Sequence, residues 1–246
     1  MAERVDWDAA YGEYATVPYN FSGSHPMKPI ELAGSVVRRM GTPTDEDARW
    51  LTEALQDDER KWFVADLAHR CESLAELFFI PMLEAAIEEV NPSSNRRFVE
   101  PCMHFFGPSR VNEYLLSVVE TGTDFRKAGA VSALYWARGF SYEYPGSKPF
   151  AAMEMSEDDR KRRRTVLLET FVANPNLDVR RCIIPPLNLD PTHYPESHRP
   201  LVAKAIEIAR ASADDYIRQR AALQIERQGS RKYPPLPHRD KGAGGS

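Results

Sequence analysis

The stretch DFRKAGAVSALYW, residues 124–136, shows how the whole chain is organised. It opens with Asp124, an acid that can accept hydrogen bonds from the free amides of a first helical turn and that suits the positive end of the helix dipole. Two basic residues follow, and small and apolar residues then recur at helical spacing, with Ala130 and Leu134 on one face. The pattern predicts a short helix that buries this face.

The same plan recurs four more times along the chain. Each copy is centred on a basic residue, which we call its anchor: Arg60, Arg96, Lys127, Arg180 and Arg218. The residues three and seven positions after each anchor are apolar, and an Asp or Ser of the capping type stands two or three positions before it. The anchors are 36, 31, 53 and 38 residues apart, so four of the five copies fit a repeat in the thirties, a length typical of stacked helix pairs.

An apolar helix is expected ahead of each anchor helix, as its partner in a pair. The long spacing between the third and fourth anchors is explained by an insertion over residues 139–156. We therefore predict an aromatic N-terminal arm and capping helix over residues 1–44, a repeat domain over residues 45–229 and a flexible tail over residues 230–246. The aromatic arm is expected to lie over the first helices and to cover their apolar edge.

The stretches DVRRCII (residues 178–184) and DFRKAGAVSAL (residues 124–134) resemble HEAT repeats, particularly the short kind first noted in phycobilin lyases. That kind has an acid, an apolar residue and an arginine, followed by small residues that end in Ala-Leu. The resemblance covers roughly residues 45–229 and is closest in the third to fifth copies. It implies an all-α, right-handed α-solenoid of about five HEAT-like helix pairs, with the anchor helices as its inner layer. The family spans adaptors, lyases, nucleic-acid enzymes and regulators, so the resemblance implies stacking rather than one chemistry.

The composition is typical of a folded protein in water. Hydrophobic residues make up 42% of the 246 residues and charged residues 28%, and no apolar run approaches the ~20 residues of a membrane helix. The three cysteines are far apart and match neither a disulfide framework nor a zinc pattern. We therefore expect a cytoplasmic protein with no metal, no other cofactor and no membrane contact.

The net charge of −4 conceals two halves of opposite sign. Residues 1–123 contain 11 Lys and Arg against 21 Asp and Glu, whereas residues 124–246 contain 21 against 15. The electric field between an acidic and a basic half can steer a charged partner toward the protein. The alternative is two solvated faces without a particular purpose.

Basic residues of the anchor helices form the first candidate contact surface. The anchors themselves are expected to pair with the capping acid of a neighbouring copy, which is a structural role. The basic residues close to them are the better candidates for partner binding: Lys61, Arg97, Arg181 and Arg220. The connections that leave the anchor helices gather on one edge of such a stack, and their aromatic residues are a second set of candidates, part of which is expected to fold back onto the helix ends. This set comprises Phe105, Phe140, Tyr142, Tyr144 and Tyr194.

No hydrolase elbow, phosphate loop or dinucleotide fingerprint is present, so the sequence assigns no catalytic residue. The function we expect is non-catalytic binding of another protein, as a scaffold or as an antitoxin-like regulator. The alternative is a nucleic-acid-binding or base-excising HEAT-like enzyme with a basic inner groove. For that alternative, Asp66, one helical turn after Trp62, is the candidate carboxylate. A tetrapyrrole lyase is a third possibility that rests on the family resemblance alone.

Overall fold

The computed structural model describes residues 5–17, 28–40, 44–71, 75–138 and 155–229. These residues form twelve α-helices, three short 3-10 helices and no strand, which confirms the all-α prediction for them. The α-helices are α1 (Trp7–Thr16), α2 (Lys28–Met40), α3 (Asp45–Ala54), α4 (Arg60–Ala68), α5 (Phe79–Glu88), α6 (Arg96–Phe106), α7 (Pro108–Thr121), α8 (Asp124–Trp136), α9 (Glu157–Ala173), α10 (Leu177–Ile183), α11 (Arg199–Ala211) and α12 (Asp215–Gly229). The 3-10 helices are η1 (Glu76–Phe78), η2 (Pro191–His193) and η3 (Glu196–His198).

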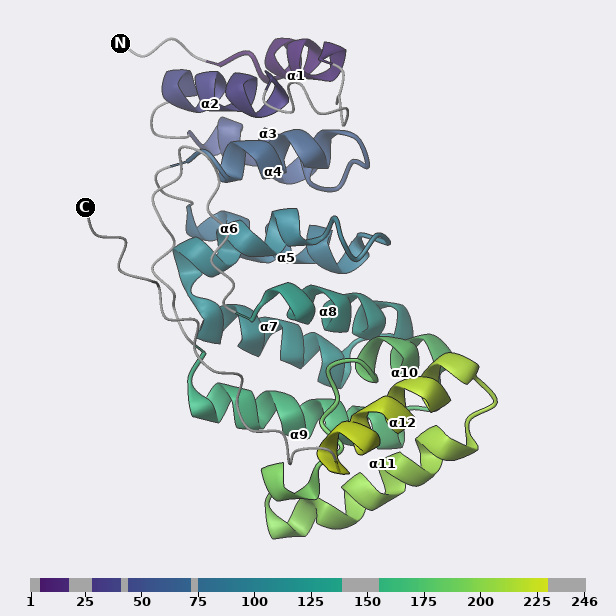
Figure 1. Cartoon of the computed structure of the whole chain (residues 1–246). Coiled ribbons are helices and arrows are strands. Elements are labelled where there is room, and N and C mark those ends of the chain that lie inside the picture. The colour runs from purple at the N-terminus through teal and green to yellow at the C-terminus, as the bar shows by residue number, and fades with distance from the viewer. Residues whose placement is uncertain (1–4, 18–27, 41–43, 72–74, 139–154, 230–246) are drawn as a thin grey trace, which may run out of the picture.

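The helices follow one another as antiparallel pairs that lie in layers along the molecule (Figure 1). From α3 onward, the two helices of every pair are joined at one edge, on the right of the view, and successive pairs are connected at the opposite edge. The second helices of the pairs are the predicted anchor helices α4, α6, α8, α10 and α12, and each contacts the next along the column. We call these five helices the anchor layer.

The apolar positions of the repeated pattern are buried, as the periodicity predicts. The residue three positions after each anchor is completely inaccessible in all five copies: Phe63, Val99, Ala130, Ile183 and Ala221. Burial of such a stripe is the main source of stability for short helices, which are marginal on their own. The residue that the sequence pattern predicts to be buried is therefore part of the core in every copy.

The aromatic N-terminal arm begins with α1, which packs on the first pair. Trp7 stacks on Trp50 of α3 at a centroid distance of 5.5 Å, and its indole Nε1 donates a hydrogen bond of 2.6 Å to Asp47. The ring of Tyr14 lies 4.9 Å from that of Phe63 on α4. These contacts agree with the expectation that the arm covers the first helices.

Three anchors have a structural role that differs from the expected one. Lys127 donates to the backbone carbonyls of Val119 and Glu120 at the C-terminal end of α7. Arg180 donates to the carbonyl of Phe171 near the end of α9, and Arg218 donates to that of Ser212, which follows α11. The anchor thus satisfies free carbonyls at the end of the preceding helix, where a positive charge also suits the helix dipole. The prediction that these anchors pair with acids of neighbouring copies was wrong.

The insertion over residues 139–156 and the tail over residues 230–246 fall almost entirely outside the described residues, so the predicted domain boundaries stay predictions. Among the described residues, no helix is long and apolar enough to cross a membrane. Within the same part of the chain, no three His, Cys, Asp or Glu side chains gather in a way that could hold a metal ion. Cys71, Cys102 and Cys182 are free thiols.

Candidate functional site

Asp66 lies where three helices from different parts of the chain meet. It is on α4, only 3% exposed, and its Oδ2 accepts a hydrogen bond of 2.7 Å from the hydroxyl of Tyr14 on α1. Its Oδ1 accepts a hydrogen bond from the guanidinium of Arg97 on α6, which also forms an ion pair with it. Both carboxylate oxygens are therefore acceptors, and a charge-assisted bond of this kind holds the side chain in one orientation.

Trp62 stands one helical turn before Asp66 and is enclosed by cations and a second ring. The guanidinium carbon of Arg97 lies 5.1 Å from the centre of the indole, and the ammonium of Lys61 lies 5.3 Å from it. The ring of Phe98 is 5.2 Å away. Distances below about 6 Å are those of favourable cation–π contacts. Arg97 thus joins the carboxylate of Asp66 to the face of Trp62.

The arrangement continues onto α8 through Trp136. Arg96, the neighbour of Arg97, places its guanidinium carbon 5.6 Å from the centre of the Trp136 ring. The indole Nε1 donates a hydrogen bond of 2.7 Å to the carbonyl of Pro92, in the turn before α6. The two tryptophans and the two arginines are all half-buried. We call Trp62, Asp66, Arg96, Arg97 and Trp136 the cation–aromatic band, and it crosses α4, α6 and α8.

The anchor layer has a consistent sign of charge. Each of α4, α6, α8, α10 and α12 contains one more basic than acidic residue. The first helices α3, α5 and α7 contain more acidic than basic residues, whereas α9 and α11 contain more basic ones. In the N-terminal half of the column, the two layers are therefore oppositely charged. A basic surface next to aromatic rings is typical of nucleic-acid binding.

His69, the residue that follows α4, is next to this band. Burial is the main cause that lowers its pKa to about 3, and the positive charges of Arg97, Arg96 and Arg70 contribute to the same shift. The imidazole is therefore neutral in the folded protein at neutral pH. Protonation of this ring opposes folding, because it would add a charge in a buried and already positive environment.

Acid is expected to destabilise the fold partly through His69. The unfolded chain takes up a proton near the ordinary pKa of 6.5, whereas the folded chain does so only near about 3. This part of the stability is therefore fully present above pH 6.5 and is lost as the pH falls, and the loss should amount to about 2 kcal/mol at pH 5. Urea unfolding at pH 7.5 and pH 5 checks this: His69→Gln, which does not titrate, should lose about 2 kcal/mol less than the wild type. Equal losses in both proteins would show that His69 is not the group responsible.

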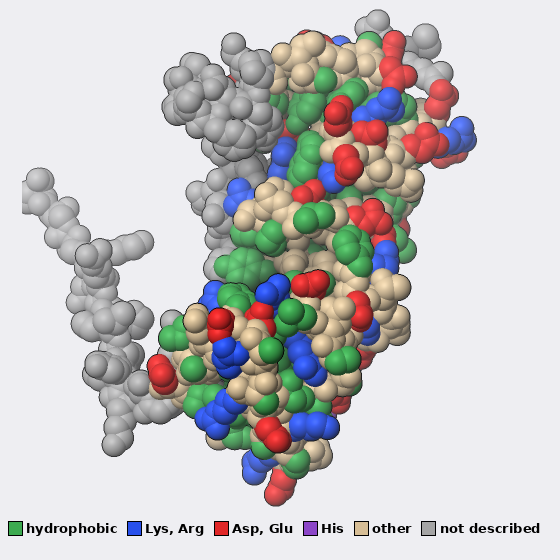
Figure 2. Space-filling model, turned by 90° about the vertical axis from the view of Figure 1, so that its right-hand side faces the viewer, with side chains coloured by type: hydrophobic (Ala, Val, Ile, Leu, Met, Phe, Trp, Pro, Cys, Tyr) green, Lys and Arg blue, Asp and Glu red, His purple; other side chains and the backbone are tan. Residues whose placement is uncertain are grey.

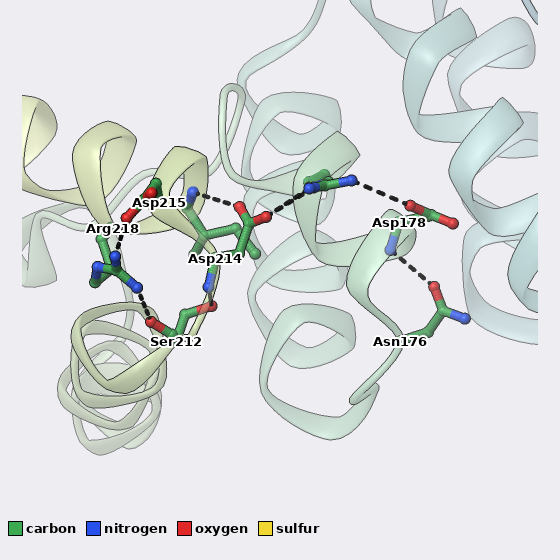
Figure 3. A network of polar contacts seen from close by, with 8 residues as sticks. Asn176, Asp178, Ser212, Asp214, Asp215 and Arg218 are labelled. Carbon is green, nitrogen blue, oxygen red and sulfur yellow. Dashed lines mark hydrogen bonds and ion pairs between the residues drawn. The ribbon is translucent and has the colours of Figure 1, made fainter.

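The predicted partner-binding cations are mostly engaged within the protein. Lys61 is buried and forms ion pairs with Asp58 and, at 3.1 Å, with Glu89 after α5. Arg181 on α10 pairs with Asp214 before α12 at 2.6 Å, within the network in Figure 3. Arg97 pairs with Asp66, so these three cations connect successive pairs. Arg220 remains exposed, and its guanidinium carbon lies 5.4 Å from the centre of the Tyr216 ring.

The aromatic candidates of the inter-pair connections have different positions. Phe105 is half-buried against His104, with 4.6 Å between ring centres. Tyr194 is only 5% exposed, and its hydroxyl donates to the carbonyl of Asn188. It therefore folds back onto the connection between α10 and α11 instead of offering a contact surface. The other three candidates lie outside the described residues: Phe140, Tyr142 and Tyr144.

The sequence pattern identified Asp66 and Trp62, and it selected Lys61 and Arg97 as contact residues for a partner without linking them to Asp66 or Trp62. Tyr14 and Trp136 carry no local signal for this site, because they approach it only through the packing of separate helices. In the structure, Arg97 pairs with Asp66 and lies over Trp62, and its predicted contact with a partner stays a prediction. Comparisons with protein-family models, with curated proteins and with solved structures give no match to this chain.

Proposed function

We propose that this protein is a right-handed α-solenoid of HEAT-like helix pairs that binds nucleic acid along its anchor layer and cleaves an N-glycosidic bond at Asp66. The observation that carries the proposal is the position of Asp66 between Tyr14 and Arg97, one turn from Trp62. A carboxylate beside aromatic rings on a basic surface combines what binding a nucleotide and stabilising a sugar cation require. This proposal corresponds to the alternative stated from the sequence, a base-excising HEAT-like enzyme.

Two features support binding of nucleic acid. The net positive charge of every anchor helix favours contact with phosphates, which supply most of the affinity of such complexes. Trp62 and Trp136 are half-buried, so part of each ring remains accessible to a base, and base stacking is worth about 1–3 kcal/mol per base. Arg97 lies beside Trp62 and Arg96 lies beside Trp136, so each ring has a cation next to it.

The chemistry of Asp66 favours a base that leaves without being protonated. Both carboxylate oxygens accept hydrogen bonds, so the group is suited to oppose a positive charge and not to donate a proton. A base that already carries a formal positive charge fits this site, since it departs as a neutral molecule with the electron pair of the N-glycosidic bond. The anomeric carbon becomes cationic opposite the carboxylate, water then adds to it, and the water proton passes to Asp66 or to solvent. The sugar would displace the hydroxyl of Tyr14 to reach the carboxylate.

Asp66→Asn is expected to slow base release about 100-fold, because the amide keeps the shape and an acceptor for Tyr14 but loses the negative charge. The measurement is single-turnover release of N7-methylguanine, a cationic base, from duplex DNA. Asp158→Asn, at a side chain that is 96% exposed on α9, is the matched control and should react like the wild type. Fluorescence anisotropy with the same duplex should give similar affinities for all three proteins. Release by the wild type at no more than the spontaneous rate would refute the proposal.

The expected non-catalytic scaffold or regulator remains a second candidate. It is favoured by a different part of the surface, the edge at which the two helices of each pair are joined, where apolar side chains are exposed in four successive pairs. A protein can use its helix layer and its turns for different partners, so the two candidates do not compete for the same residues.

A further inference from the structure

The edge at which the helices of each pair are joined, which we call the turn edge, carries one exposed apolar residue in each of four successive pairs. Val90 follows α5 and is 86% exposed, and Phe125, the second residue of α8, is 63% exposed. Leu177, the first residue of α10, is 44% exposed, and Tyr216, the second residue of α12, is 41% exposed. Four of the eight large exposed hydrophobic residues in the described ranges thus lie on one edge. Scattered exposed hydrophobic residues are ordinary, but a row along the same edge of successive layers indicates a contact surface.

Exposed acids lie at the turns of the first three pairs, of which the second and third carry Val90 and Phe125. Asp57 and Glu59 lie in the turn between α3 and α4, Glu88 ends α5, and Asp124 begins α8. Figure 2 looks onto the turn edge and shows acidic side chains gathered over its upper, N-terminal part, with hydrophobic side chains among them. This part of the edge is therefore both acidic and apolar.

The basic residues at the same turns are less exposed than these acids, because they make contacts within the protein; Arg96, for example, lies over Trp136, and Lys127 donates to carbonyls at the end of α7. Arg60 lies over the rings of Tyr11 and Trp50, and Arg97 is paired with Asp66. Arg126 makes a two-bond ion pair with Glu84 of α5. All of these basic residues are half-buried, whereas the acids named above are exposed. The most exposed charges that a partner meets at these turns are therefore acidic.

The last two pairs differ in this respect. Arg181 bridges Asp178 and Asp214, and Arg218 pairs with Asp215 (Figure 3). Their turns therefore hold matched charges. The excess of exposed acids therefore lies at the turns of the first three pairs, where Val90 and Phe125 are the two most exposed apolar residues.

We propose that the turn edge of the first three pairs binds a basic segment of another protein, in which apolar side chains recur about every third residue. Packed helices lie about 8–10 Å apart, and an extended chain advances about 3.3 Å per residue, so one layer corresponds to about three residues. Apolar side chains of the segment contact Val90 and Phe125, and its lysine and arginine side chains face the exposed acids. The proposal does not rest on nucleic-acid binding, because it uses the exposed acids and apolar residues of the turn edge and none of the residues of the cation–aromatic band.

A fluorescently labelled 12-residue peptide of repeated Lys-Lys-Leu tests this inference by anisotropy. It should bind at least tenfold more tightly than peptides of repeated Lys-Lys-Ser or Glu-Glu-Leu, because both charge and apolar contact are needed. Val90→Ser combined with Phe125→Ser should weaken binding at least tenfold. Leu223→Ser, at a residue that is 48% exposed in the middle of α12, is the matched control and should bind like the wild type.

Circular dichroism is expected to give the same melting temperature for the wild type and both variants, since the substituted side chains are exposed. Equal affinity for the three peptides, or unchanged binding by the double variant, would overturn the proposal. Sedimentation velocity supplies a further test: a dimer of the wild type that dissociates in the double variant would identify a second copy of the chain as the occupant and would also overturn it.

Discussion

Replacement of Gly129 by alanine is expected to lower the free energy of unfolding by at least about 3 kcal/mol. Gly129 lies in the middle of α8, where α8 packs on α5. A Cβ atom there would stand 2.0 Å from the carbonyl oxygen of Ile87 and 2.9 Å from its carbonyl carbon. These are backbone atoms of α5, so no side chain can rotate away, and the two helices have to separate. Urea unfolding of both proteins gives the change directly.

Gly12→Ala is the matched control for this prediction, because it makes the same substitution inside another helix, α1. A Cβ atom at Gly12 would have no neighbour within 4 Å. Alanine is favoured over glycine in helix interiors by about 1 kcal/mol, so this variant should be slightly more stable than the wild type. The two substitutions are expected to change the free energy of unfolding in opposite directions. A stabilising effect at Gly129 would mean that α5 and α8 do not approach each other as the structure describes.

The layered arrangement of the helices could be predicted because its signal is local and repeated. Five anchors with apolar residues three positions later define one buried face per copy, and all five of these residues are inaccessible. The need for glycine at position 129 was not predictable from the same pattern. Its cause is the backbone of Ile87, 42 residues earlier in the chain, and helical periodicity carries no information about how closely two pairs approach.

The cations that join the pairs show a second limit of the sequence pattern. Adjacent basic residues such as Arg180 and Arg181 differ in direction by about 100° around the helix, and the pattern does not determine which one faces the neighbouring pair. The structure shows Arg180 bonded to the end of α9 and Arg181 paired with Asp214. Arg126 and Lys127 differ in the same way, with Arg126 paired across to Glu84.

The candidate site was predictable only as far as it lies on one helix. Trp62 and Asp66 are four residues apart, so their shared face follows from helical geometry. The partners of Asp66 are separated from it by 52 residues for Tyr14 and by 31 for Arg97. Contacts between residues so far apart in the sequence depend on the packing of α1 and α6 against α4, which no short motif encodes.

Removal of Arg97 is expected to be the second strongly destabilising change. Arg97→Met retains much of the side-chain volume but leaves the carboxylate of Asp66, whose side chain is 4% exposed, with the Tyr14 hydroxyl as its described partner. Breaking a buried ion pair on one side costs about 3–5 kcal/mol, because the remaining charge is desolvated and uncompensated. Arg160→Met is the control, since its ion pair with Glu157 joins side chains that are 45% and 54% exposed. Its cost should be about 0–1 kcal/mol in the same urea experiment.

The double variant Asp66→Asn with Arg97→Met separates the structural role of this pair from the proposed reaction. Neither charge of this buried pair remains in it, so most of the stability lost in Arg97→Met should return, and the difference between the single and double variants measures the coupling between the two side chains. Asp66→Asn alone should lower the free energy of unfolding less than Arg97→Met does, because the Arg97 side chain is 18% exposed and retains access to water. A stable double variant that no longer releases N7-methylguanine would assign the carboxylate to the reaction as well as to the fold. A double variant as unstable as Arg97→Met would show instead that Arg97 stabilises the protein mainly through its contact with Trp62.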